Sequence, residues 1–193
     1  ACLIGSALLF YAGWELIIVG LLCVLFAFLY TTGPYPLSYN GWGDVLVIVF
    51  FGFVPVGGTY YVQALTWTSD TTVASLICGL LIDTLLVVNN YRDREADARS
   101  GKRTVIVRFG EKFGRYLYLM LGMTASLLCF WFFFEGHLFA ALLPLLYLIP
   151  HVLTWRRMVQ IHSGKKLNSI LGETSRNMLL MGILLSIGFL IRH

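Results

Sequence analysis

The residues best suited to chemistry lie between positions 89 and 104. Asp93 and Asp97 are four residues apart, so on a helix their side chains share one face. Asn89 and Asn90 lie within reach of that face. Two carboxylates on neighbouring turns repel each other unless a cation lies between them, and Mg²⁺ typically takes one or two carboxylates together with substrate phosphates. The spacing therefore predicts a Mg²⁺ site formed by Asp93 and Asp97.

Basic residues follow this acidic pair directly. Gly101 is a plausible helix end, and Lys102 and Arg103 come next. Flexible cations beside a carboxylate-bound metal suit a diphosphate group, and arginine can contact it through two parallel hydrogen bonds. The pattern favours a metal-dependent diphosphate site. The alternative is a solvated charged loop that only sets membrane topology.

The composition defines the elements that must position these residues. Of the 193 residues, 58% are hydrophobic and only 12% are charged, whereas soluble domains have about 25% charged residues. This excludes a water-soluble globule, a disordered tail and a secreted disulfide scaffold. The cysteines lie in apolar runs without metal-ligand spacing. The expected fold is all-α, a polytopic transmembrane helix bundle.

Apolar segments divide the chain into candidate membrane spans. A spanning helix needs about 20 mostly apolar residues, which predicts about six full spans and, at residues 1–11, a partial first helix. The six segments are 16–30, 42–62, 71–91, 115–134, 138–155 and 176–191. Pro55 predicts a kink in the second of them. No linker or repeat divides the chain, so residues 1–193 form a single transmembrane domain.

The distribution of positive charge predicts the orientation. All 14 Lys and Arg residues follow position 91, and 13 of them lie in the patches Arg92–Arg115 and Arg156–Arg176. Placing both patches inside leaves the three outer turns free of Lys and Arg, as the positive-inside rule requires. We therefore expect a multi-pass protein of the cell inner (plasma) membrane with its active-site loops cytoplasmic. The lipid bilayer is an expected partner and nucleic acid is not.

Two stretches resemble a known family. The string Asn89-Asn90-x-Arg92-Asp93-x-x-x-Asp97-x-x-x-Gly101-Lys102-x-Thr104 resembles the second aspartate-rich motif of the UbiA superfamily of intramembrane prenyltransferases, and within it the branch that prenylates 1,4-dihydroxy-2-naphthoate. Residues 30–44 resemble the loop and helix re-entry of the same family. Both stretches fall on the predicted cytoplasmic face.

The resemblance implies a reaction. Such an enzyme uses Mg²⁺ to transfer a polyprenyl group from polyprenyl diphosphate to 1,4-dihydroxy-2-naphthoate. Carbon dioxide is lost and demethylmenaquinone forms as its quinol, a step in menaquinone biosynthesis. Asp93 and Asp97 would hold the metal, and Lys102 and Arg103 would contact the diphosphate.

Other residues receive substrate-binding or catalytic roles from the same resemblance. Asn89, Asn90 and Arg92 are candidates for contact with the metal, the diphosphate or the naphthoate carboxylate. Tyr30 and Tyr39 could line the cleft where the allylic cation forms, because an aromatic face stabilises a cation. The alternative for both is a tyrosine of the membrane interface.

Two further acids have open roles. Asp44 could position the aromatic hydroxyl or act as a base, and the alternative is a simple acid at a helix N-terminus. Asp83 lies inside an apolar run, where a carboxylate is costly and usually faces an interior or a cavity. It could face the active site or serve as a polar partner within the bundle.

One departure from the family pattern is clear. Nothing in residues 1–193 matches the family's first aspartate-rich motif, of N-D-x-x-D type. We therefore expect the N-terminal helices and that motif to be missing from this chain, and the chain alone to be inactive. Two alternatives remain open, a related prenyltransferase with another aromatic acceptor and a membrane transporter fragment with Asp83, Asp93 and Asp97 on an ion path.

Overall fold

The computed structural model describes residues 5–191, and this part of the chain is helical without strands. Its elements are, in chain order, η1 (Ser6–Leu8), α2 (Leu9–Ala12), α3 (Glu15–Thr31), η2 (Leu37–Tyr39), α4 (Gly43–Val47), η3 (Ile48–Gly57), α5 (Gly58–Ala64), α6 (Ser69–Arg99), α7 (Val105–Leu128), α8 (Trp131–Phe134), α9 (Leu138–Leu142), η4 (Leu143–Tyr147), α10 (Leu148–Ile161) and α11 (Leu167–Leu190). The predicted all-α bundle is confirmed.

Five helical segments in the described part are long and apolar enough to cross a membrane. They are Gly43–Ala64, Ser69–Arg99, Val105–Phe134, Leu138–Ile161 and Leu167–Leu190. These are the helices of a multi-pass membrane protein. The prediction of six full spans is corrected, because α3, which covers the predicted segment 16–30, has only 17 residues. Gly33 and Pro34 follow this helix closely and oppose its continuation.

Helices α6, α7, α10 and α11 extend beyond their predicted membrane segments. Helix α6 continues to Arg99, so Asp93 and Asp97 lie on a helix as predicted. Helix α11 begins at Leu167 rather than near 176, because its first turns bury Leu167 and Ile170 against the bundle while polar residues face outward. Part of the second basic patch is therefore helical.

The kink predicted near Pro55 takes the form of a π-helical stretch, η3. Proline has no backbone N–H and cannot donate the hydrogen bond of a regular α-helix. A π-helical turn is one way to accommodate this missing hydrogen bond. This stretch packs closely on α6. A Cβ added to Gly52 would lie 2.5 Å from the carbonyl oxygen of Ser75 and 2.7 Å from Cα of Gly79. The two helices are thus in backbone contact at these glycines.

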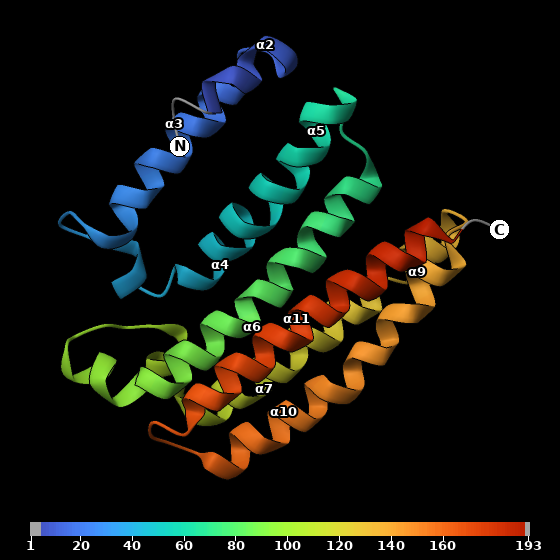
Figure 1. Ribbon diagram of the computed structural model, residues 1–193. Coiled ribbons are helices and arrows are strands. Elements are labelled where there is room, and N and C mark those ends of the chain that lie inside the picture. Colours follow the sequence, from blue (N-terminus) through green and yellow to red (C-terminus); the bar gives the residue numbers. More distant parts are fainter. Residues whose placement is uncertain (1–4, 192–193) are drawn as a thin grey trace.

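Helix α6 lies between the two halves of the bundle (Figure 1). On one side are α4, η3 and α5, and beyond them α3, which contacts them through the rings of Phe26 and Phe50 at a centroid distance of 5.2 Å. On the other side are α7, α10 and α11. Buried hydrogen bonds join these helices, including Tyr118 Oη with Thr174 Oγ1 at 3.0 Å.

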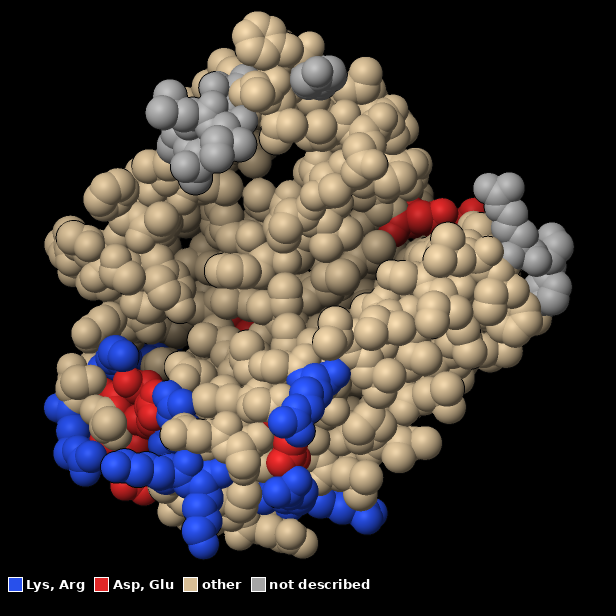
Figure 2. All heavy atoms as spheres, viewed as in Figure 1, with Lys and Arg blue, Asp and Glu red and all other residues tan. Residues whose placement is uncertain are grey.

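Lys and Arg side chains gather at one end of the visible face (Figure 2). Both basic patches belong to this end, because side chains of the α6–α7 region contact the α10–α11 region. Arg92 Nη1 donates to Asn168 Oδ1 at 3.0 Å, and His162 Nε2 lies 3.0 Å from Glu111 Oε2. The prediction that the two patches share one end of the bundle is confirmed.

Candidate active site

A polar cavity of about 360 Å³ opens at the basic end of the bundle. Helix α6 forms one wall, and Leu86, Asn90, Asp93 and Asp97 line the cavity from successive turns of one face. The opposite wall comes from the end of α3, the following loop and the start of α4. The cavity is lined by Tyr30, Thr31, Ser38, Tyr39, Gly41, Gly43, Asp44, Leu86, Asn89, Asn90, Asp93, Asp97, Lys102 and Thr104.

Hydrogen bonds join the two loops that close this end. The backbone N–H of Arg103 donates to the carbonyl oxygen of Tyr39 at 2.7 Å, and Arg108 Nη2 donates to the carbonyl oxygen of Asn40 at 2.8 Å. Gly41 adopts a φ of +82°, and a Cβ there would lie 3.0 Å from the carbonyl oxygen of Arg103. A glycine is therefore required at this turn. The two sequence stretches predicted to share a face are in direct contact.

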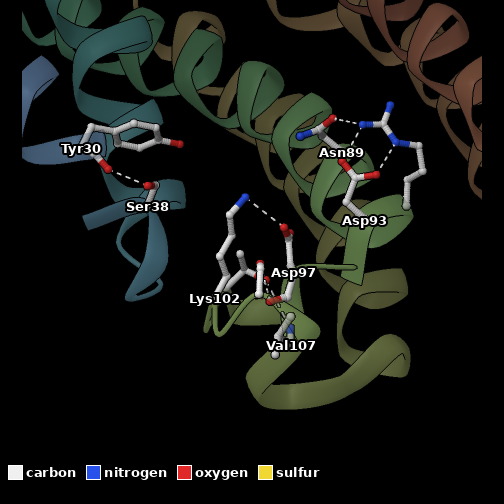
Figure 3. Close-up of polar contacts among 10 residues, drawn as sticks. Tyr30, Ser38, Asn89, Asp93, Asp97, Lys102 and Val107 are labelled. Carbon is white, nitrogen blue, oxygen red and sulfur yellow. Dashed lines mark hydrogen bonds and ion pairs between the residues drawn. The ribbon is translucent and has the colours of Figure 1, made fainter. Parts of the chain in front are cut away.

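The two aspartates have different cationic partners (Figure 3). Arg92 holds Asp93 through two hydrogen bonds, from Nε at 2.7 Å and from Nη2 at 2.6 Å, and also donates to Asn89 Oδ1 at 2.7 Å. Asp97 pairs with Lys102, whose Nζ lies 3.0 Å from Oδ1. That bond raises the pKa of Lys102, so the ammonium group stays charged at neutral pH.

Most of the predicted site residues lie together. Eight of them line the cavity, namely Tyr30, Tyr39, Asp44, Asn89, Asn90, Asp93, Asp97 and Lys102. Arg92 and Arg103 do not belong to this lining. Arg92 reaches toward Asn168 of α11 and fixes Asp93, and Arg103 is exposed and joins the two loops through its backbone N–H.

The sequence did not single out six of the lining residues as site residues, namely Thr31, Ser38, Gly41, Gly43, Leu86 and Thr104. Ser38 Oγ donates to the carbonyl oxygen of Tyr30 at 2.5 Å, and Thr104 Oγ1 caps α7 by accepting from the N–H of Val107 at 3.3 Å. A Cβ on Gly43 would lie 3.4 Å from Leu86 Cδ2. The sequence could have indicated Thr104, because a threonine directly before an apolar helix is a typical N-cap residue. The positions of Ser38, Gly43 and Leu86 depend on packing between helices.

The donor atoms of the cavity suit a hard cation. Asp93, Asp97 and the two asparagines offer oxygen ligands, which Mg²⁺ prefers. Residues 5–191 contain no group of three or more His, Cys, Asp or Glu side chains that could hold a metal by themselves. The residues present thus fit a metal bound by two carboxylates, with the remaining positions left for phosphate oxygens, water or further ligands.

An apolar cavity of about 560 Å³ adjoins the polar one and shares Tyr30 and Leu86 with it. Its walls come from α3 on one side and from α4 and η3 on the other. The other lining residues are Cys23, Phe26, Ala27, Leu46, Val47, Phe50 and Phe51. A hydrocarbon chain attached to a group in the polar cavity could extend along this apolar surface.

Residues 1–188 match the UbiA prenyltransferase family, and the chain belongs to that family. A curated relative from Haemophilus influenzae, named 1,4-dihydroxy-2-naphthoate octaprenyltransferase, is 36% identical over 180 residues, which cover 90% of this chain and 56% of the relative. A Mycobacterium tuberculosis protein of the same name is 44% identical over 119 residues, covering 62% of this chain and 40% of its own length.

A more distant relative lies outside bacteria. The UbiA prenyltransferase domain-containing protein 1 of Dictyostelium discoideum is 30% identical over 162 residues, or 84% of this chain and 48% of its own. The chain spans about half the length of the curated relatives it matches. No solved structure matches it significantly.

Proposed function

We propose that the protein to which this chain belongs transfers a polyprenyl group from polyprenyl diphosphate to 1,4-dihydroxy-2-naphthoate, with loss of carbon dioxide, to give demethylmenaquinone in its reduced (quinol) form. One observation carries the proposal. The cavity brings Asp93, Asp97 and Lys102 together with an adjoining apolar surface. A prenyl diphosphate has the same two parts, an anionic head and an apolar tail. The names of the bacterial relatives support the choice of acceptor.

Residues at different places in the cavity would contact different parts of the reacting molecules. Asp93 and Asp97 would hold Mg²⁺, which when bound stabilises the charge of the departing diphosphate. Lys102 supplies a mobile positive charge beside them, with its Nζ 5.3 Å from the centroid of the Tyr39 ring. The rings of Tyr30 and Tyr39 line the volume where positive charge develops on the allylic carbon, and an aromatic face favours such a charge.

The proposed reaction balances without a further co-reactant. The allylic carbon–oxygen bond breaks and the diphosphate keeps the electron pair. The ring carbon that bears the carboxylate forms the new bond to the allylic carbon. The bond from that ring carbon to the carboxylate then breaks, carbon dioxide leaves, and the electron pair returns to the ring.

The proposal includes a location. The basic end of the bundle would face the cytoplasm, and the helices would cross the inner (plasma) membrane, because Lys and Arg are retained on the inner side. The diphosphate and the naphthoate would then enter the cavity from the cytoplasm or its membrane interface, and the prenyl tail would remain among lipid-facing helices.

The test is release of labelled carbon dioxide from carboxyl-labelled 1,4-dihydroxy-2-naphthoate. Membranes containing the full-length protein receive a polyprenyl diphosphate, with and without Mg²⁺. We expect release that needs both the donor and the divalent ion. Prenyl transfer to a different aromatic compound without release would overturn the choice of acceptor, and absence of any transfer would overturn the enzymatic proposal.

A further inference from the structure

A second pair of acids lies deeper than the predicted metal ligands. Asp83 is 1% exposed, and its Oδ1 is buried without a hydrogen-bond partner among the described residues. Oδ1 of Asp44, which lines the polar cavity, is in the same condition within residues 5–191. The two residues lie at facing positions of the α4–α6 contact, because Gly43 meets Leu86 on one side of them and Ile48 meets Gly79 on the other.

Asp83 lies on α6 one turn before Leu86, the first α6 residue of the cavity lining, and is not itself part of that lining. It precedes Leu86 by three residues and Asn90 by seven, so it continues the face from which Leu86, Asn90, Asp93 and Asp97 line the cavity. One turn deeper, Gly79 packs against η3, and a Cβ there would lie 2.9 Å from the carbonyl oxygen of Ile48. The close packing of α6 on η3 therefore lies on the N-terminal side of Asp83 along α6, and the cavity lies on its C-terminal side.

Two buried carboxyl oxygens without a hydrogen-bond partner are unfavourable until something donates hydrogen bonds to them. A hydroxyl group satisfies this requirement. A ligand carboxylate at the same place would be repelled, because it would bring a third acid to a site that has no cation of its own. Within the cavity lining the cation is Lys102, at the other end beside Asp97. The inner end of the cavity therefore offers hydrogen-bond acceptors, and the lining cation lies at the mouth, where Asp93 and Asp97 would also hold the proposed metal.

We infer that Asp83 and Asp44 together bind the hydroxyl group of the acceptor that lies farthest from its carboxylate, the 4-hydroxyl of 1,4-dihydroxy-2-naphthoate. This inference rests on the proposed function. It assigns a place to Asp83 and an orientation to the acceptor. With the 4-hydroxyl at the inner end, the carboxylate and the carbon that bears it face Asp93, Asp97 and Lys102. That is the end where the diphosphate leaves and the new bond forms.

The orientation makes a prediction about ligands of the wild-type protein. 1-Hydroxy-2-naphthoate lacks only the 4-hydroxyl, and 4-hydroxy-2-naphthoate lacks only the 1-hydroxyl. As competitive inhibitors against the acceptor, the first should bind roughly 10- to 100-fold more weakly than the second, because it leaves the buried acids without a donor. Equal inhibition constants, or the reverse order, would overturn the inference without any variant being made.

Variants of the acids then locate the effect. Asp83→Leu in the full-length protein should raise the KM for the acceptor roughly tenfold or more and leave the KM for the prenyl diphosphate within about twofold. It should also abolish the discrimination between the two inhibitors. Asp83→Asn keeps the volume and a hydrogen-bonding oxygen, so it should retain part of the discrimination. Glu95→Gln is the matched control, since Glu95 is an exposed acid on the same helix.

The outcomes separate this inference from the proposed function. If the wild-type protein releases no carbon dioxide from the naphthoate, the proposed function fails. If it does so but the Asp83 variants keep the wild-type acceptor KM, the inference alone fails. An equal rise in both KM values with lower thermal stability would show a structural role and would also overturn it. Where Asp83→Leu does not fold, Asp44→Asn and the inhibitor pair decide the question.

Discussion

Asp93 and Asp97 line the same cavity, yet their partners differ in rigidity. Arg92 holds Asp93 by two hydrogen bonds and also donates to Asn168 of α11, whereas Lys102 holds Asp97 by a single contact from the α6–α7 loop. A fixed arginine fork preserves the orientation of a carboxylate, and a single ammonium group can leave it. Under the proposed function, Asp93 would be positioned in advance, and Asp97 would exchange Lys102 for a metal while Lys102 moves to the diphosphate.

Replacing either aspartate should remove turnover. We expect Asp93→Asn or Asp97→Asn in the full-length protein to reduce the rate of carbon dioxide release roughly 100-fold or more, because the neutral amide binds a divalent cation poorly. The thermal unfolding temperature in detergent should stay close to that of the wild type. Arg99→Ala is the matched control on the exposed side of the same helix end. Activity within a fewfold of wild type would contradict the metal-ligand assignment.

Arg92 should behave as a positioning residue. Arg92→Lys loses the two-bond contact to Asp93 and the contact to Asn168. We expect the Mg²⁺ concentration for half-maximal activity to rise roughly tenfold, because groups that orient metal ligands affect metal affinity on that scale. The KM for the acceptor should be unchanged. A rise in acceptor KM without a change in Mg²⁺ dependence would instead place Arg92 against the naphthoate.

Lys102 should act on the donor. Lys102→Ala is expected to raise the KM for polyprenyl diphosphate roughly tenfold, since it removes a charge-assisted hydrogen bond. The bond to Asp97 raises the pKa of Lys102 above that of a free lysine side chain. The ammonium form therefore persists throughout the pH range in which a free lysine is charged, and it is lost only at higher pH. The donor KM should therefore be flat between about pH 7 and 9 as far as Lys102 is concerned. A steep rise over that range in wild type but not in Lys102→Ala would contradict this.

At the scale of single residues, the sequence predicts arrangements that depend on spacing along one helix. The four-residue spacing of Asp93 and Asp97 on a continuous helix is enough to place both on one face. The role of Arg92 could not be derived in this way, because its partner Asn168 lies 76 residues further along the chain. The same holds for Ser38 and Leu86, which reach the cavity only because α3, α4 and α6 meet there.

At the scale of elements, helix contact depends on small residues at particular places. Gly52 and Gly79 allow η3 and α6 to touch, and this contact closes the region below Asp83. The hydropathy pattern finds both helices but does not say which glycines face one another. It also overestimates the number of full spans, since α3 is apolar throughout but stops at Thr31. The length of α3 is limited by Gly33 and Pro34, which oppose continuation of the helix, and not by hydropathy.

A pair of glycine variants tests this contact. Gly52→Ala should destabilise the protein by roughly 1–3 kcal/mol, because its Cβ would lie 2.5 Å from a backbone oxygen of α6 that cannot move independently. Gly58→Ala has no heavy atom within 4 Å of the added carbon and should be neutral or slightly stabilising. The measurement is thermal unfolding in detergent. Equal effects of the two variants would show that the helices are not packed through Gly52.

At the scale of the whole molecule, charge and chemistry coincide at one end. The basic patches that predict the cytoplasmic side gather at the end of the bundle where the cavity opens (Figure 2). The uneven distribution of Lys and Arg thus has two effects. Positive charge is retained on the inner side during membrane insertion, and the same charge attracts an anionic diphosphate. The grouping of the patches could be predicted from the sequence because the positive-inside rule depends on loop composition. The cavity itself could not, because it forms between helices distant in the chain.

This coincidence makes the membrane orientation testable with single cysteines. A cysteine at Ser163, in the loop between α10 and α11, should react with a membrane-impermeant maleimide only after the cells are permeabilised. A cysteine at Glu135, in the turn between α8 and α9, should react in intact cells. Of the four native cysteines, Cys23 and Cys78 lie within helices and Cys129 lies in the turn between α7 and α8. The background from all four, Cys2 included, is measured on the unsubstituted protein. The opposite pattern would place the cavity mouth outside, away from cytoplasmic substrates, and would overturn both the orientation and the proposed route of substrate entry.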